Sequence, residues 1–160
     1  MNTEPALMSR MIEASESEPT QVGEIMTRNP ITLNEEDDLS TVQEEMQNIG
    51  LRHIPVVDGK KLVGLVSHRD LLAHTLHTQR RNSMLDAMAE HEKHERFVAD
   101  IMTRGVKTAR IDTPLAEAAG WIATGKFGCL PVVDDDGTLL GIVTENDFVK
   151  LIAARWNAHH

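Results

Sequence analysis

Apolar residues recur along this chain in two patterns, one typical of helices and one typical of strands. The helical pattern has intervals of three and four residues and consists of Leu39, Val42, Met46 and Ile49. It predicts an amphipathic helix. Two runs rich in β-branched residues follow, at 54–57 and 62–66, and the Asp-Gly turn between them predicts a hairpin. We also expect a short strand at 31–33 and a second helix over about 69–77.

The same order of elements returns in the second half of the chain. Thr113 and Pro114 predict a helix start there, because a threonine hydroxyl can cap a helix and proline suits its first position. The apolar stripe of this helix is expected to be Leu115, Ala118, Ala119 and Ile122. A hairpin is predicted at 130–133 with 139–143, followed by a closing helix over about 145–155.

Three motifs show that the chain is a duplication. Val-Gly-Glu-Ile-Met-Thr-Arg at 22–28 returns as Val-Ala-Asp-Ile-Met-Thr-Arg at 98–104, and His-Ile-Pro-Val-Val-Asp at 53–58 returns as Cys-Leu-Pro-Val-Val-Asp at 129–134. Gly-Leu-Val-Ser at 64–67 returns as Gly-Ile-Val-Thr at 141–144. A unit of about 60 residues is marginally stable alone. We therefore expect the two repeats to pack on each other, share a core and be related by a pseudo-twofold axis.

The motifs place one unit at 21–77 and the other at 98–155. Residues 1–20 predict a short helix and a flexible segment, which either packs on the module or recruits a partner. Residues 78–97 predict a helical linker that either covers the module's edge or forms a dimer contact. Residues 156–160 are expected to be a tail.

Composition narrows the classes of function. With 160 residues, 41% of them hydrophobic and 26% charged, the chain is typical of a globular protein. It has no apolar run near 18 residues and no signal-like leader, so we expect a cytoplasmic protein that does not enter a membrane. The single cysteine fits a reducing compartment. A net charge of −9 argues against a nucleic-acid partner. An anionic ligand would therefore need a few well-placed donors.

The third strand of each repeat ends in a hydroxyl residue that is followed three positions later by aspartate. These pairs are Ser67 with Asp70 and Thr144 with Asp147. One interpretation is a variant of the capping box, in which the side chains satisfy free N–H groups of the helix. The other is a ligand site, because N–H groups and the helix dipole attract phosphate, and aspartate can accept from two ribose hydroxyls. The sequence leaves both open.

This order of motifs, repeated once over about 22–153, resembles a tandem pair of CBS domains, the module named after cystathionine β-synthase. The resemblance implies an α+β fold of two βαββα units packed through their sheets, with internal pseudo-twofold symmetry. It implies a stand-alone regulatory module without catalysis or an obligatory cofactor. Its ligand would be an adenine nucleotide such as AMP, ADP or ATP, bound in clefts between the units. It also implies a homodimer that signals to an unidentified effector protein.

Carried over residue by residue, the resemblance implies two ligand sites. The first would comprise Thr32, Arg52, His53, Ile54, Pro55, Ser67, Arg69 and Asp70. The second would comprise Thr108, Cys129, Leu130, Pro131, Thr144, Asn146 and Asp147. The two aspartates would bind the ribose, and Ser67 and Thr144 would bind the ribose or the phosphate. Thr32 and Thr108 would lie near the base and the sugar. The segments 54–55 and 130–131, which contain the prolines, would line the adenine slot.

Only the first repeat keeps a cationic pair before its proline strand, Arg52 and His53, where the second has Gly128 and Cys129. Charged hydrogen bonds to phosphate are the stronger kind. We therefore expect a nucleotide site built mainly on the first repeat. The second site would be weaker, empty or suited to an uncharged ligand, unless Lys126 compensates.

Other functions remain open. The clefts could be degenerate in a purely structural module, or they could bind S-adenosylmethionine or a cyclic dinucleotide. The sequence contains no P-loop, no dinucleotide-binding fingerprint and no set of catalytic residues, so we do not expect an enzyme. The histidine pairs 74/77 and 91/94 have a spacing that can hold a metal, but they lack Cys or carboxylate partners, so we predict solvated helix faces and no metal. We expect Cys129 to be a packed thiol rather than a nucleophile.

Overall fold

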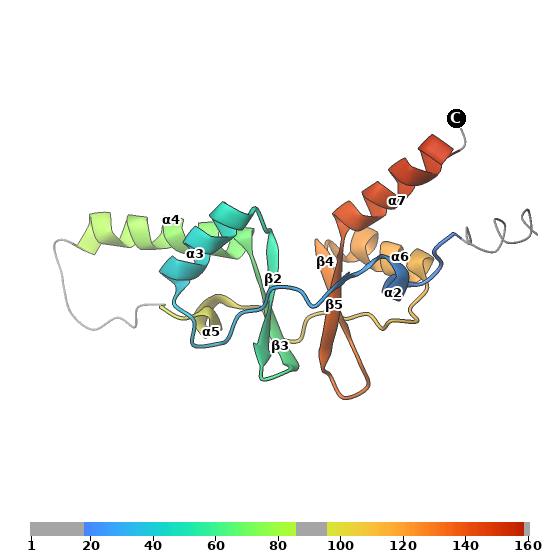
Figure 1. Cartoon of the computed structure of the whole chain (residues 1–160). Coiled ribbons are helices and arrows are strands. Elements are labelled where there is room, and N and C mark those ends of the chain that lie inside the picture. Colours follow the sequence, from blue (N-terminus) through green and yellow to red (C-terminus); the bar gives the residue numbers. More distant parts are fainter. Residues whose placement is uncertain (1–17, 86–95, 159–160) are drawn as a thin grey trace, which may run out of the picture.

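The computed structural model describes residues 18–85 and 96–158, and two similar halves lie side by side in it (Figure 1). The first half contains helix α3 (Leu39–Ile49), strands β2 (His53–Asp58) and β3 (Lys61–Ser67), and helix α4 (His68–Leu85). The second contains helix α6 (Leu115–Gly125), strands β4 (Cys129–Val133) and β5 (Leu139–Thr144), and helix α7 (Glu145–Ala158). The predicted α+β fold with two related units is confirmed.

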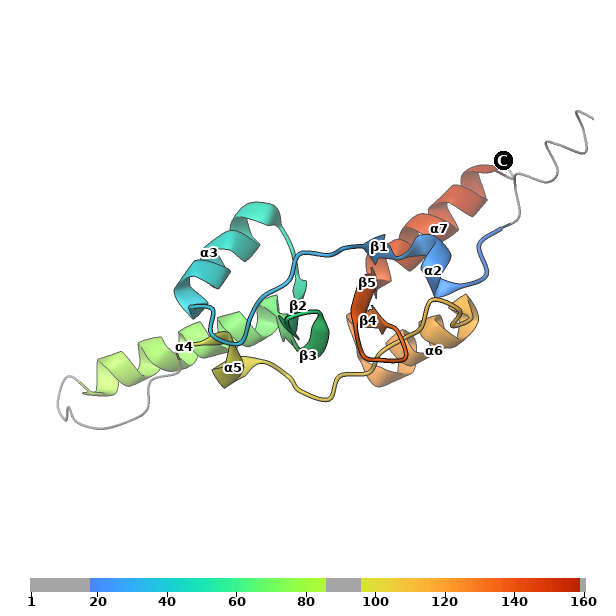
Figure 2. The ribbon, with the colours of Figure 1, turned by 60° about the horizontal axis from the view of Figure 1, so that its bottom comes forward.

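Each half is completed by a segment of the other repeat. Helix α2 (Val22–Ile25) belongs to the first repeat but lies in the second half, next to the start of α6, whereas helix α5 (Val98–Ile101) lies in the first half against α4 (Figures 1 and 2). The Val22 N–H donates to Thr113 O at 2.9 Å, and the Val98 N–H donates to Asp37 O at 2.9 Å. The packing units therefore differ from the sequence repeats.

The strands form the two predicted hairpins. Strands β2 and β3 pair in an antiparallel sheet, and so do β4 and β5. Strand β1 (Thr27–Arg28) pairs with β5 and gives the second sheet its third strand. The hairpins meet at their tips, where Leu139 N–H donates to Lys60 O at 2.9 Å and Leu62 N–H donates to Gly137 O at 3.1 Å. These contacts join the two sheets across the middle of the molecule.

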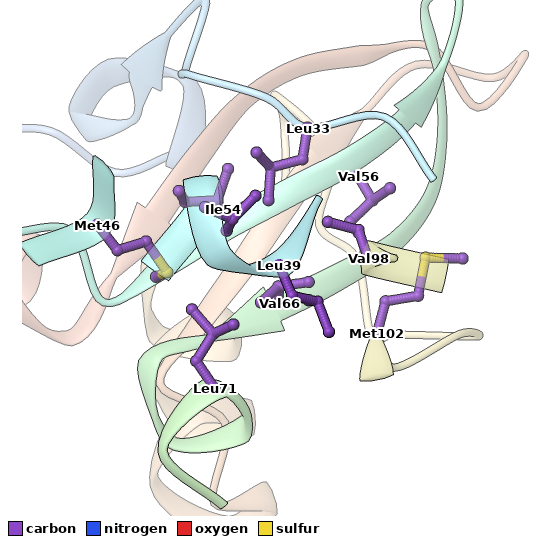
Figure 3. Close-up of a cluster of buried hydrophobic side chains, with 10 residues drawn as sticks. Leu33, Leu39, Met46, Ile54, Val56, Val66, Leu71, Val98 and Met102 are labelled. Carbon is purple, nitrogen blue, oxygen red and sulfur yellow. The ribbon is translucent and has the colours of Figure 1, made fainter. Parts of the chain in front are cut away.

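The hydrophobic interior consists of two clusters, not the single shared core that we expected. The first cluster comprises Leu33, Leu39, Val42, Met46, Ile54, Val56, Val66, Leu71, Val98 and Met102 (Figure 3). The second comprises Val22, Met26, Ala109, Leu115, Ala118, Ile122, Leu130, Val132 and Val143. Because two members of each cluster come from the exchanged segment, both clusters still require both repeats.

Glycine in the third motif is explained by this exchange. A Cβ atom at Gly64 would lie 2.9 Å from Thr103 O, and one at Gly141 would lie 2.7 Å from Thr27 O. Both distances are too short for ordinary contact. The glycines therefore let the exchanged segment lie directly against the strand.

Two local predictions were wrong. Residues 31–33 do not form a strand, because only Leu33 makes a bridge, a parallel one to Val56. Thr113 does not cap α6: its hydroxyl accepts from the Arg110 N–H at 2.8 Å, so it closes the preceding turn, and Pro114 occupies the N-cap position without a side-chain cap.

The flanking segments also differ from expectation. Helix α4 runs on to Leu85, so residues 78–85 of the predicted linker extend that helix, and residues 96–97 are not helical. Helix α7 runs on to Ala158, beyond the predicted tail boundary. Of the predicted N-terminal helix only residues 18–20 are described, and they are not helical. Residues 1–17, 86–95 and 159–160 lie outside the described part.

Candidate functional site

The turns from strand to helix have the hydrogen bonds of the capping interpretation. The Ser67 hydroxyl donates to Asp70 Oδ2 at 2.6 Å, the Ser67 N–H donates to the same oxygen at 2.9 Å, and the Asp70 N–H donates back to the hydroxyl at 3.1 Å. Thr144 repeats the first two bonds to Asp147 Oδ2, at 3.0 and 2.8 Å. No hydrogen bond among the described residues uses Oδ1 of Asp70, so this cap does not occupy the whole carboxylate.

A pocket of about 970 Å³ lies next to the first of these turns. Its lining residues come from both repeats: Arg52, His53, Leu65, Ser67, His68, Arg69, Asp70, Leu72, Thr103, Gly105, Val106, Lys107, Thr108, Lys126, Phe127, Gly128, Cys129 and Glu145. The volume is at the upper end of the range for small-molecule sites. The pocket brings together five residues of the predicted first site with Thr108 and Cys129 of the predicted second site.

The remaining predicted site residues do not line this pocket. Thr32 is exposed elsewhere, and Ile54 and Pro55 are buried in strand β2. Leu130 and Pro131 are likewise buried in β4. Thr144, Asn146 and Asp147 lie at the other strand-to-helix turn, outside the pocket lining.

The mixed lining follows from the exchanged segment. Thr103 pairs with Leu65 in an antiparallel bridge, with hydrogen bonds of 2.9 and 3.0 Å in the two directions. The chain continues from this pairing into residues 105–108, which line the pocket together with the Ser67 turn. The sequence analysis assigned each site to one repeat, so it did not predict that Thr103 and residues 105–108 of the second repeat line the same pocket as Ser67 and Asp70. The recurring Met-Thr-Arg motif and its matching glycine were the sequence signal for it.

His53 lies at the contact between the halves. A Cβ atom placed on Gly128 would lie 2.5 Å from the imidazole Cε1, so the ring fills the space that a side chain at 128 would need. Burial lowers the pKa of His53 below its ordinary value, and the nearby Glu145 carboxylate opposes that shift. The ring is therefore mainly neutral at neutral pH.

Cys129 is buried, with 3% of its surface exposed. Burial, reinforced by the negative charge of Glu145, raises the pKa of Cys129 to about 12. A thiol with this pKa stays protonated at neutral pH, which agrees with the predicted packed thiol and gives no activated nucleophile.

The charged groups of the pocket favour an anion. Arg52, Arg69, Lys107 and Lys126 line it, and only Asp70 and Glu145 are acidic. The Lys107 ammonium lies 3.9 Å from the centre of the Trp121 ring, in a cation–π contact. A chain with a net charge of −9 thus gathers positive charge at one place.

Two other features bear on the class of protein. None of the helices in residues 18–85 and 96–158 is long and apolar enough to cross a membrane. Within the same residues, no three His, Cys, Asp or Glu side chains gather in a way that could hold a metal ion. His91 and His94 lie outside the described part.

Comparison with known proteins identifies the family. The family model described as CBS domain matches residues 22–77 and 98–154, so the chain belongs to the CBS domain family. It is 30% identical over 128 residues to inosine-5′-monophosphate dehydrogenase from Methanocaldococcus jannaschii, covering 79% of this chain but 22% of that enzyme. The chain spans less than half of the length of the first curated relatives, between 22% and 47%.

Solved structures of CBS pairs share the fold. CBSX2, from Arabidopsis thaliana, in complex with AMP has a TM-score of 0.69 and 28% identity, and the match covers 89% of this chain and 100% of that one. A CBS domain pair in complex with 5′-methylthioadenosine and S-adenosyl-L-methionine has a TM-score of 0.71 and 26% identity, covering 86% and 99%. Both of these relatives hold adenosine compounds.

Proposed function

We propose that this chain is a regulatory module whose pocket between the halves binds an adenosine-containing nucleotide. The observation that carries the proposal is the shared pocket, whose lining includes Ser67, Asp70 and four cationic residues. The adenosine compounds held by two similar CBS pairs support the ligand class.

Each part of the pocket suits one part of such a ligand. The Asp70 carboxylate, with Oδ1 outside the described hydrogen bonds, is placed to accept from vicinal ribose hydroxyls. Thr108 lines the same pocket and would contact the sugar or base. The Phe127 ring, 38% exposed, offers an apolar face for adenine. The basic side chains would then meet the phosphate.

The two repeats supply a matched test of this assignment. Isothermal titration calorimetry with AMP should show that Asp70→Asn weakens binding about tenfold or more, because it removes a charged acceptor. The control is Asp147→Asn, which alters the same kind of cap outside the pocket and should leave the affinity unchanged. Circular dichroism checks that both variants fold. Loss of binding in Asp147→Asn alone would place the nucleotide at the other turn.

A second ligand class has a specific observation in its favour. One similar CBS pair holds S-adenosyl-L-methionine and 5′-methylthioadenosine, which carry the same ribose and base but no phosphate. The same calorimetry with S-adenosylmethionine separates the two classes. Tighter binding of this compound than of AMP would replace the nucleotide proposal. Titration with a cyclic dinucleotide tests the remaining ligand class, and binding of none of these compounds would favour the structural module.

We further propose that the module is a homodimer and signals to an effector protein. Helices α4 and α7 carry apolar side chains that the halves leave exposed, among them Leu76 at 62%, Val149 at 61% and Ile152 at 66%. A second copy of the chain would cover these faces. Sedimentation equilibrium tests the dimer, and a monomer at micromolar concentration would contradict it. Co-purification with and without AMP tests the effector.

A further inference from the structure

Lys126 has an unusual backbone conformation at the end of helix α6. Its φ is 57°, in the left-handed region that residues with a Cβ atom rarely adopt. The matched position of the first repeat is Gly50, with a φ of 72°. Glycine adopts this conformation without steric cost. The fold therefore accepts glycine at the end of this helix, and backbone geometry alone gives no reason for a lysine.

The surroundings of Lys126 supply a reason. Its side chain lines the same pocket as Asp70, and in the described part of the chain no hydrogen bond or ion pair engages its ammonium group. The neighbouring Phe127 ring lies over Gly125, where a Cβ atom would be 2.5 Å from the ring carbon Cδ2. Both Lys126 and Phe127 line the pocket that we propose for the ligand.

The position of this charge follows from the contact between the halves. The first repeat has its basic side chain at Arg52, and the matched residue of the second repeat is Gly128. A side chain at 128 would overlap the His53 ring, so it would require that ring to move. An arginine at the matched position would therefore displace His53. The second repeat instead carries its positive charge two residues earlier, at Lys126.

We propose that Lys126 binds the phosphate group of the ligand, so that the pocket selects phosphorylated adenosine compounds over unphosphorylated ones. This inference rests on the proposed function and specifies its ligand class. It also adds a residue of the second repeat to the basic residues of the first repeat that would contact the phosphate. A charge-assisted hydrogen bond formed in a partly enclosed pocket is strong enough to set such a preference.

The test compares AMP and adenosine by calorimetry in the wild type, Lys126→Gly and Lys150→Ala. The glycine variant reproduces Gly50 and relieves the left-handed strain, so its melting temperature should equal or exceed that of the wild type. It should bind AMP about tenfold more weakly and bind adenosine unchanged. Lys150→Ala removes the same charge from an exposed site outside the pocket and should change neither affinity.

The possible outcomes separate the two proposals. Unchanged AMP affinity in Lys126→Gly would overturn this inference and leave the proposed function standing. Equal weakening of AMP and adenosine would also overturn it, because the lysine would then shape the pocket and not contact phosphate. A lower melting temperature with unchanged selectivity would assign Lys126 a structural role. A wild-type protein that binds neither compound would overturn the proposed function together with the inference.

Discussion

The two halves build the same interior from side chains of different size. Leu33 in the first cluster corresponds to Ala109 in the second, and Val42 corresponds to Ala118. The second half recovers apolar volume elsewhere, because Trp121 packs against its cluster where the first repeat has the exposed Glu45. The duplicated fold therefore fixes which positions are buried, and the size of each residue is settled within each half.

The halves differ in another way where they face each other. His53 and Gly128 meet across the contact, so a large side chain on one side requires a missing side chain on the other. The repeats therefore differ at this contact, where Arg52 and His53 of the first repeat correspond to Gly128 and Cys129 of the second.

The largest expected change in the free energy of unfolding comes from exchanging matched residues between the two cores. Leu33→Ala gives the first core the residue of the second and should destabilise the protein by about 2–5 kcal/mol, because it leaves a cavity. The converse change, Ala109→Leu, should cost about 1–3 kcal/mol through overpacking. Urea unfolding followed by circular dichroism measures both. A neutral Ala109→Leu would show that the second core has unfilled space.

The contact between the halves gives a smaller effect. Gly128→Ala should destabilise the protein by about 1–3 kcal/mol, because the new methyl group would overlap the His53 ring. Adding His53→Ala should restore part of that loss. The control is Gly120→Ala, at a helix position with no neighbouring atom within 4 Å, which should stabilise by about 0.5–1 kcal/mol. Strictly additive effects of the first two changes would contradict the contact.

The smallest expected effect is a difference in pH dependence between matched positions 53 and 129. Because the folded pKa of His53 lies below its ordinary value of 6.5, the unfolded chain binds the proton more readily, and this residue lowers stability as the pH falls below 6.5. The folded pKa of Cys129 is raised from 9.0 to about 12, so this residue lowers stability as the pH rises above 9.0.

Thermal unfolding across the pH range separates the two contributions. His53→Gln should reduce the loss of stability on the acid side only, and Cys129→Ala should reduce it on the alkaline side only. The wild type serves as the reference for both profiles. If His53→Gln leaves the loss of stability below pH 6.5 unchanged, another group causes that loss.

Much of the fold could be predicted from local patterns. The α3 helix, both hairpins and both Ser/Thr-to-Asp caps followed from spacings within a few residues, and the structure confirms them. The errors occurred where a distant contact or a neighbouring turn competes with local preference. Thr113 bonds to Arg110 and not to the helix, and a strand at 31–33 is reduced to one bridge.

The candidate site was harder to predict. The sequence singled out the Ser67 and Asp70 turn and the basic pair of Arg52 and His53, and all four residues line one pocket. It assigned Thr108 and Cys129 to a different site, because similarity between repeats gives no information about which repeat faces which. That assignment depends on the path of residues 98–108.

By itself, the sequence determined the duplication, the main helices and the hairpins, because each depends on spacing or on a residue's own conformational preference. Only the tertiary structure decided that α2 and α5 exchange places, that the pocket draws on both repeats, and that His53 lies against Gly128. These contacts join segments far apart in the chain. Their formation depends on how whole surfaces fit together, which local periodicity does not encode.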